Sequence, residues 1–282
     1  MNRVDTWRFR WQLARTIGRR DLHVAIYDIR LYATLSATIA IAATLLRNDV
    51  ESIQGNGFVI LSNPLLIPLF GAAVVSSIYL AVASTTTVAR ERERGTLEVL
   101  FYGPVDAVAY LLGKVLAQMG VYALMVAVYL AALALYALII NFVFALNLLL
   151  AALLSVATTS AVVTVGILLS TLHRSVRSAL LTLLAIALAF LGVQLGHDHV
   201  CSLTSGMARG DYNPLLLALQ TLFTWLDRIF NSLSPLAYLK RGFDVLLRGS
   251  VAEYVLTMGL SLLYSAVAFG LAVWTLRRKG VR

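Results

Sequence analysis

Residues 65–89 form the apolar run that decides the fold, and they read LLIPLFGAAVVSSIYLAVASTTTVA without one charged side chain. A helix needs about 20 apolar residues to cross the hydrocarbon core of a bilayer. The run therefore predicts a transmembrane helix, and five further runs of the same kind predict five more. The six predicted spans are residues 29–46, 65–89, 114–140, 142–170, 179–196 and 251–276.

The composition of the whole chain agrees with these runs. Of its 282 residues, 60% are hydrophobic and only 13% are charged, whereas soluble proteins average about 45–50% and about 25%. A soluble domain cannot bury so much apolar surface. We therefore expect an all-α integral membrane protein that forms one transmembrane domain over residues 1–282. A soluble enzyme is excluded, and the single cysteine, Cys201, excludes an internal disulfide.

Lysine and arginine are distributed unevenly around the six predicted spans. With the N-terminus placed inside, the inner segments hold 17 of the 23 basic residues and the outer segments hold six. Cytoplasmic loops of membrane proteins carry such an excess. The pattern predicts a multi-pass protein of the cell membrane with both termini in the cytoplasm. The net charge of +9 thus reflects orientation in a lipid bilayer, and we expect no nucleic-acid partner.

Residues 1–26 precede the first span and mix arginines with Trp7, Phe9 and Trp11. Basic residues interleaved with aromatic ones are typical of a helix that lies in the membrane interface. We therefore predict an N-terminal amphipathic elbow helix, and a basic cytosolic tail is the alternative.

Residues 197–250 form the longest predicted outer loop and contain two apolar pieces, 215–230 and 236–247, with Pro235 between them. The first piece is too short to cross the bilayer as a seventh span, and it carries Asp227 and Arg228. A seventh span would also move the basic C-terminal tail outside. We predict a re-entrant helical hairpin before the last span, packed against protein because backbone at that depth needs partners.

Residues 90–108 lie on the predicted cytosolic side, between the second and third spans. Gly95 is expected to break the helix that arrives from the membrane, and Thr96 is expected to cap the next one. The apolar residues of this next helix, at i, i+3 and i+4, predict one apolar face that can dock in a groove of a soluble partner. The apolar face consists of Leu97, Leu100 and Phe101. Gly103-Pro104 is expected to end this helix.

Lys114 begins the third predicted span, and its side chain is expected to extend to the lipid headgroups.

The motif Glu91-x-x-x-Gly95-Thr96-Leu97-Glu98-x-Leu100, followed by Pro104-Val105, resembles the coupling-helix region of ABC-2 type transporter permeases. A second, weaker resemblance is that of residues 233–249 to the outer re-entrant hairpin of these permeases. The predicted elbow, six spans and long last outer loop are also similar to the family layout, so that the resemblance covers nearly the whole chain.

The resemblance implies a permease subunit of an ATP-driven exporter. Two permeases, either two copies of this chain or this chain and a related one, are expected to sit on two ATP-binding subunits. ATP and Mg²⁺ are expected on those partners, with no cofactor on this chain. The resemblance implies a coupling element and, in the next inner loop, a second contact with the ATP-binding subunit. The coupling residues are Glu91, Glu93, Gly95, Thr96, Leu97, Glu98, Leu100 and Pro104, and the second contact loop contains His173, Arg174 and Arg177.

The chain shows no nucleotide-binding loop of its own. Its only Gly-Lys pair, Gly113-Lys114, is followed by Val115, whereas a phosphate-binding loop needs Ser or Thr there and a second glycine before it. We therefore expect a transport subunit rather than an enzyme. No predicted span carries a charge near its middle, which disfavours ion coupling and favours an amphipathic, lipid-like or drug-like substrate.

Two further groups of polar residues have alternative interpretations. His197, His199 and Cys201 contain metal-ligand types, which leaves a membrane-embedded metal-handling (copper-type) or scaffold protein using residues 197–250 as the alternative function; a plain polar loop is the favoured interpretation. Five hydroxyl residues in span 142–170 fit either a polar pathway or close helix packing, and packing is favoured. These hydroxyl residues are Ser155, Thr158, Thr159, Ser160 and Thr164.

Overall fold

A computed structural model describes residues 3–56, 65–102, 105–140, 146–205 and 214–279. Within these ranges the chain is helical, without a strand, which confirms the predicted all-α class. Predicted site residue Pro104 lies outside the described residues. The helices are α1 (Arg3–Ile26), α2 (Ile29–Asn56), α3 (Leu66–Glu93), α4 (Thr96–Phe101), α5 (Ala107–Ile140), α6 (Leu146–Leu172), α7 (Val176–Ser205), α8 (Pro214–Leu233), α9 (Pro235–Arg248) and α10 (Val251–Lys279).

Six of these helices are long and apolar enough to cross a membrane, namely α2, α3, α5, α6, α7 and α10. The predicted number of spans is therefore confirmed. The boundaries differ, because a helix continues for as long as its backbone hydrogen bonds do. The candidate span in α2, Ile29–Asn48, agrees with the predicted 29–46, and the helix continues beyond it through polar residues to Asn56. Helix α5 begins at Ala107 instead of Lys114.

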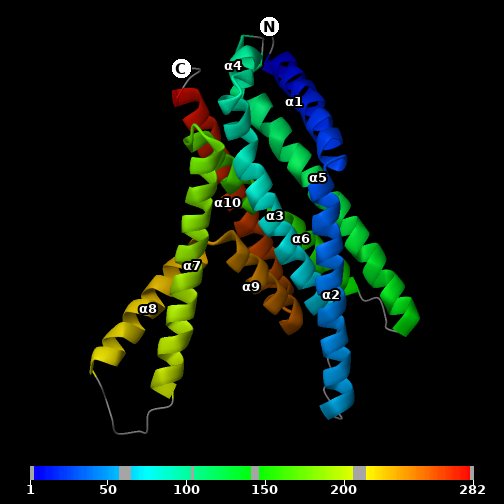
Figure 1. Cartoon of the computed structure of the whole chain (residues 1–282), viewed down its shortest axis with the longest axis vertical. Coiled ribbons are helices and arrows are strands. Elements are labelled where there is room, and N and C mark those ends of the chain that lie inside the picture. Colours follow the sequence, from blue (N-terminus) through cyan, green and yellow to red (C-terminus); the bar gives the residue numbers. More distant parts are fainter. Residues whose placement is uncertain (1–2, 57–64, 103–104, 141–145, 206–213, 280–282) are drawn as a thin grey trace.

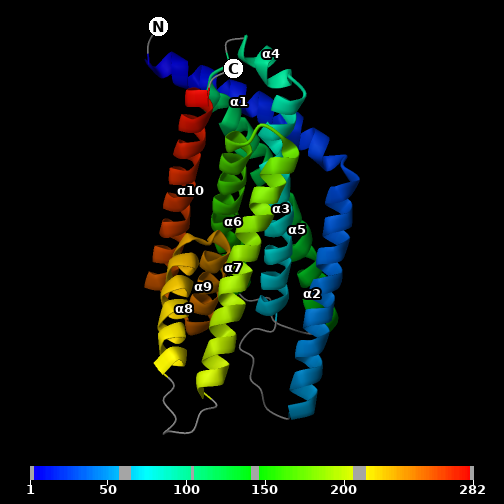
Figure 2. The same ribbon diagram turned by 60° about the vertical axis from the view of Figure 1, so that its left-hand side comes forward.

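Helix α6 forms the centre of the bundle, with α3 and α10 packed along it (Figures 1 and 2). In the apolar window of α6, 67% of the residues are buried, against 6% in the window of α7. Helix α7 therefore lies at the periphery, where its leucines are left to face lipid or another subunit.

Hydroxyl side chains hold α6 to its two main neighbours. Ser77 of α3 and Thr159 of α6 are hydrogen-bonded at 3.0 Å, and Thr171 of α6 and Thr275 of α10 at 2.9 Å. Small hydroxyl residues let helices approach closely and satisfy their own polar groups. The favoured interpretation of the hydroxyl residues in the predicted span, close packing, is therefore confirmed for Thr159; Thr171 lies just beyond that span and packs in the same way.

Helices α8 and α9 form a hairpin whose turn, Ser234, is extended (φ −78°, ψ 118°). Pro235 begins α9, which proline favours because its missing N–H is unneeded there. In Figure 1 the turn lies part-way along the bundle, and both helices run from it toward the end opposite α4. Helix α9 packs against α6 and α10 with Leu239 and Phe243 buried, and the ring of Phe243 lies edge-on to that of Phe70 on α3 at 5.1 Å. The predicted helical hairpin is present, and its depth in a membrane stays a prediction.

Helix α1 lies across one end of the bundle, the end at which α4 and the last turn of α10 also lie (Figure 2). It packs on α5 where two glycines meet. A Cβ added to Gly113 would lie 2.9 Å from the carbonyl oxygen of Ala14, and one added to Gly18 would lie 3.1 Å from that of Gly113. The two backbones therefore touch, and this contact places the C-terminal half of α1 beside the first turns of α5. That α1 lies in the membrane interface stays a prediction.

Candidate functional site

The break between α3 and α4 occurs at Gly95, as predicted. Its φ is +71°, in the left-handed region that glycine adopts readily. The backbone N–H groups of Arg94 and Gly95 donate to the carbonyls of Arg90 and Arg92, each at 3.1 Å, and so close the last turn of α3. The chain then turns directly into α4.

Thr96 was expected to cap α4, and the structure corrects this. Gly95 occupies the cap position, and the Thr96 hydroxyl donates backward to the carbonyl oxygen of Glu91 at 3.1 Å. A left-handed residue at the cap turns Thr96 toward the end of α3. The hydroxyl therefore ties α4 to α3 instead of starting the new helix.

The faces of α4 are also arranged differently from the prediction. Leu97 is only 3% exposed and belongs to the buried core, and Leu100 packs partly against that core. Leu97 and Leu100 therefore pack against the chain itself, because the end of the bundle supplies apolar neighbours, whereas the side chain of Phe101 lies outside the described residues. The exposed face carries Glu98, Val99 and Tyr102.

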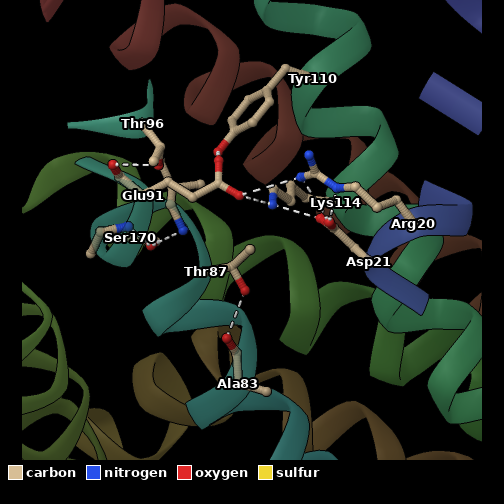
Figure 3. A network of polar contacts seen from close by, with 11 residues as sticks. Arg20, Asp21, Ala83, Thr87, Glu91, Thr96, Tyr110, Lys114 and Ser170 are labelled. Carbon is tan, nitrogen blue, oxygen red and sulfur yellow. Dashed lines mark hydrogen bonds and ion pairs between the residues drawn. The ribbon is translucent and has the colours of Figure 1, made fainter. Parts of the chain in front are cut away.

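Glu91 is the centre of a partly buried polar network that connects three helices (Figure 3). Its carboxylate accepts a hydrogen bond from the hydroxyl of Tyr110 at 2.6 Å and pairs with the ammonium group of Lys114, both on α5. The same ammonium group lies 2.6 Å from the carboxylate of Asp21 on α1. We call Asp21, Glu91, Tyr110 and Lys114 the Lys114 cluster.

The position of Lys114 corrects the expectation that it extends to the lipid headgroups. Its side chain is only 4% exposed. Desolvating an ammonium group is costly unless oppositely charged partners replace water, and here two carboxylates do so. The Arg20 guanidinium lies 3.0 Å from Asp21 and 3.9 Å from Glu91, so that two cations balance two anions.

A second set of contacts joins the end of α3 to the α6–α7 loop. Arg92 donates to the carbonyl oxygens of Thr171 at 3.2 Å and His173 at 3.0 Å. These carbonyls belong to the last turn of α6 and the residue after it, where a helix leaves its acceptors unpaired. At the start of α7, the Glu93 carboxylate accepts from the backbone N–H of Val176 at 3.4 Å.

The two sequence-predicted contact regions therefore lie side by side. His173 is held through its backbone, and Arg174 and Arg177 are exposed. Sequence reasoning missed Asp21, Arg92 and Tyr110 as members of the site. The available signal was Lys114 itself, because a charge within an otherwise apolar span needs a partner of opposite charge.

The candidate metal residues lie on α7 and do not form a ligand cage. The Cys201 sulfur is 3.6 Å from a ring nitrogen of His197, as their spacing of four residues on a helix predicts, while His199 is exposed. Among the described residues, no group of three or more His, Cys, Asp or Glu side chains is placed to hold a metal ion. The metal-handling alternative gains no geometric support there.

Six apolar helices around a common core define a multi-pass membrane protein. A family profile described as ABC-2 family transporter protein matches residues 17–281, and the chain belongs to this family. Comparison with curated proteins found no match. Members of the family are membrane subunits without nucleotide-binding domains, and membership implies a permease component of an ABC exporter that pairs with an ATP-binding subunit.

Proposed function

We propose that this chain is the transmembrane permease of an ATP-driven exporter of the cell membrane, with both termini and α4 in the cytosol. The proposal is supported by the family and by the excess of basic residues on the side of the N-terminus. The apolar composition of the spans favours an amphipathic, lipid-like or drug-like substrate. Two permeases, identical or related, sit on two ATP-binding subunits, which bind ATP and Mg²⁺.

The coupling role is supported by the two faces of α4, one of which is buried in the bundle while the other is exposed. Its inner face is buried through Leu97, while Glu98, Val99 and Tyr102 are exposed at the end of the bundle. An exposed valine and tyrosine beside a carboxylate form a surface of the mixed kind that protein partners contact. The exposed face of α4 contacts the ATP-binding subunit. The contact therefore involves Glu98, Val99 and Tyr102 instead of the apolar face that the sequence predicted.

Movement of α4 reaches the membrane helices along two routes. Through Glu91 the segment is tied to Lys114 of α5 and to Asp21 of α1. Through Arg92 and Glu93 it is tied to the end of α6 and the start of α7. Because close-packed, ion-paired elements shift together rather than deform freely, closure of the ATP-binding subunits displaces α1, α3, α5 and the α6–α7 loop together.

Site-directed crosslinking tests this contact. In a Cys201→Ser background, Val99→Cys and Val251→Cys create cysteines at two valines of similar exposure, 71% and 75%. Val99 is on α4, and Val251 begins α10, at the end of that span away from α4. In the assembled transporter, a short thiol-to-amine crosslinker is expected to join residue 99 to the ATP-binding subunit and to leave residue 251 free of it. Crosslinking of residue 251 alone, or of neither residue in an actively transporting assembly, contradicts the proposed contact.

A further inference from the structure

Helix α1 carries a basic depression that the coupling role does not use. Its volume is ≈ 600 Å³, and its lining consists of side chains from the C-terminal half of α1. Ile17 and Gly18 are buried on the opposite side, against α5. The depression is therefore on the free face of α1. The lining residues are Arg15, Thr16, Arg19, Arg20 and His23.

The depression has an excess of positive charge. It contains three arginines and no acidic residue. The nearest carboxylate in the sequence, that of Asp21, forms ion pairs with Lys114 and Arg20. Helix α1 as a whole contains six arginines against two aspartates. The Thr16 hydroxyl donates to the carbonyl oxygen of Gln12 at 3.0 Å, and Arg20 gives two hydrogen bonds to Asp21. Arg15 and Arg19, with the remaining N–H groups of Arg20, suit an anion with several oxygen atoms, because guanidinium groups bind phosphate in a fork of two hydrogen bonds.

The surroundings of the depression are apolar and aromatic. Trp7 and Trp11 precede it on α1, and Val24 and Tyr27 follow it; all four side chains are at least half exposed. The helix also crosses the end of the spans close to the start of α2 (Figure 2). Basic residues flanked by exposed tryptophan, tyrosine and valine are the arrangement by which interfacial helices bind anionic membranes.

We propose that this depression binds the phosphate headgroup of an anionic phospholipid in the adjoining leaflet, with the neighbouring aromatic side chains against the upper part of the acyl chains. Charge complementarity selects an anionic over a zwitterionic lipid, and the exposed apolar flanks select a lipid over a soluble phosphate. Arg20 belongs both to the depression and to the ion pairs with Asp21 and Glu91. A bound headgroup therefore shares Arg20 with the Lys114 cluster.

Competition between two lipids tests the proposal on the full-length chain, without the ATP-binding partner. The purified protein is incubated with equal amounts of phosphatidylglycerol and phosphatidylcholine, and retained lipids are counted by native mass spectrometry. The variants Arg15→Gln and Arg19→Gln each remove one cation from the depression. Arg8→Gln is the matched control, because Arg8 lies on the same helical side two turns earlier and outside the depression.

Wild-type protein is expected to retain phosphatidylglycerol preferentially. Arg15→Gln and Arg19→Gln should each lower that preference about fivefold. Arg8→Gln should lower it less than either, and Arg19→Lys should keep most of it. An equal loss in all three glutamine variants indicates diffuse attraction and overturns the site. So does a wild-type protein without preference, or displacement of the lipid by excess inorganic phosphate. Because no ATP-binding subunit takes part, failure here leaves the proposed export function standing.

Discussion

The ammonium group of Lys114 lies 2.6 Å from the carboxylate of Asp21, although the two residues are 93 positions apart in the chain. The contact fastens α1 to α5 beside the point at which α3 ends. Through Glu91 it also reaches the segment that we assign to coupling. One buried cation thus connects the N-terminal helix to that segment.

Removing this cation should destabilise the protein. Lys114→Met leaves the carboxylates of Asp21 and Glu91 with Arg20 as their remaining cation, and we expect a loss of about 3 kcal/mol in unfolding free energy, the size seen when one partner of a buried pair is removed. Arg177→Gln, which removes an exposed cation, should change it by less than about 0.5 kcal/mol. Denaturant unfolding in detergent measures both. Equal stability of the two variants contradicts a structural role for the cluster.

Neutralising the whole cluster should restore much of that loss. The triple variant Asp21→Asn, Glu91→Gln, Lys114→Met leaves no buried charge, because the remaining cation, Arg20, is 58% exposed and reaches water. Buried ion pairs are often replaceable by neutral groups at little cost in stability. It should nevertheless transport poorly, because the ionic link between α1, α3 and α5 is lost. Normal transport by a stable triple variant argues against transmission through these charges.

Substitution of Gly95 tests the coupling role, and Gly249 offers a control position with the same backbone conformation. Both have positive φ, +71° and +74°, and a Cβ added at either meets nothing within 4 Å. Alanine at each position should therefore cost the same left-handed strain, about 1–2 kcal/mol. Only Gly95→Ala alters the angle between α3 and α4, so that transport per ATP hydrolysed should fall in Gly95→Ala and persist in Gly249→Ala. An identical transport loss in both variants indicates a stability effect alone.

Close packing of α3 on α6 should make Gly166 intolerant of a side chain. A Cβ at this position would lie 1.9 Å from the hydroxyl oxygen of Ser84 and 3.2 Å from the carbonyl oxygen of Ala81. Gly166→Ala should lower the unfolding free energy by about 1–3 kcal/mol. Adding Ser84→Ala removes the closest atom and should recover part of the loss. A melting temperature equal to wild type in Gly166→Ala contradicts this contact.

The orientation that follows from the basic residues can be measured with the two exposed valines. In intact cells of the Cys201→Ser background, a membrane-impermeant maleimide should label Val251→Cys and should label Val99→Cys only after permeabilisation. Val251 begins α10 at the end of that span away from α4, so that the two residues are expected on different sides of the membrane. Labelling of residue 99 in intact cells reverses the topology and with it the coupling proposal.

Local sequence determined much of this protein. Runs of apolar residues predict the six spans because a bilayer leaves a backbone few alternatives to a helix. Gly95 predicts the break after α3, since left-handed backbone favours glycine, and Pro235 marks the turn of the hairpin. These features depend on length, hydrophobicity and backbone freedom, which neighbouring residues specify among themselves.

The tertiary structure alone decided which groups meet. Lys114 has an aliphatic stem that suits the headgroups as well as a buried ion pair, and only the approach of α1 at Gly18 and Gly113 brings Asp21 close enough to decide between them. Likewise, the Leu97 face of α4 packs inward because the end of the bundle lies beneath it. Periodicity shows that a helix has an apolar face, but the partner of that face depends on contacts between segments far apart in the chain.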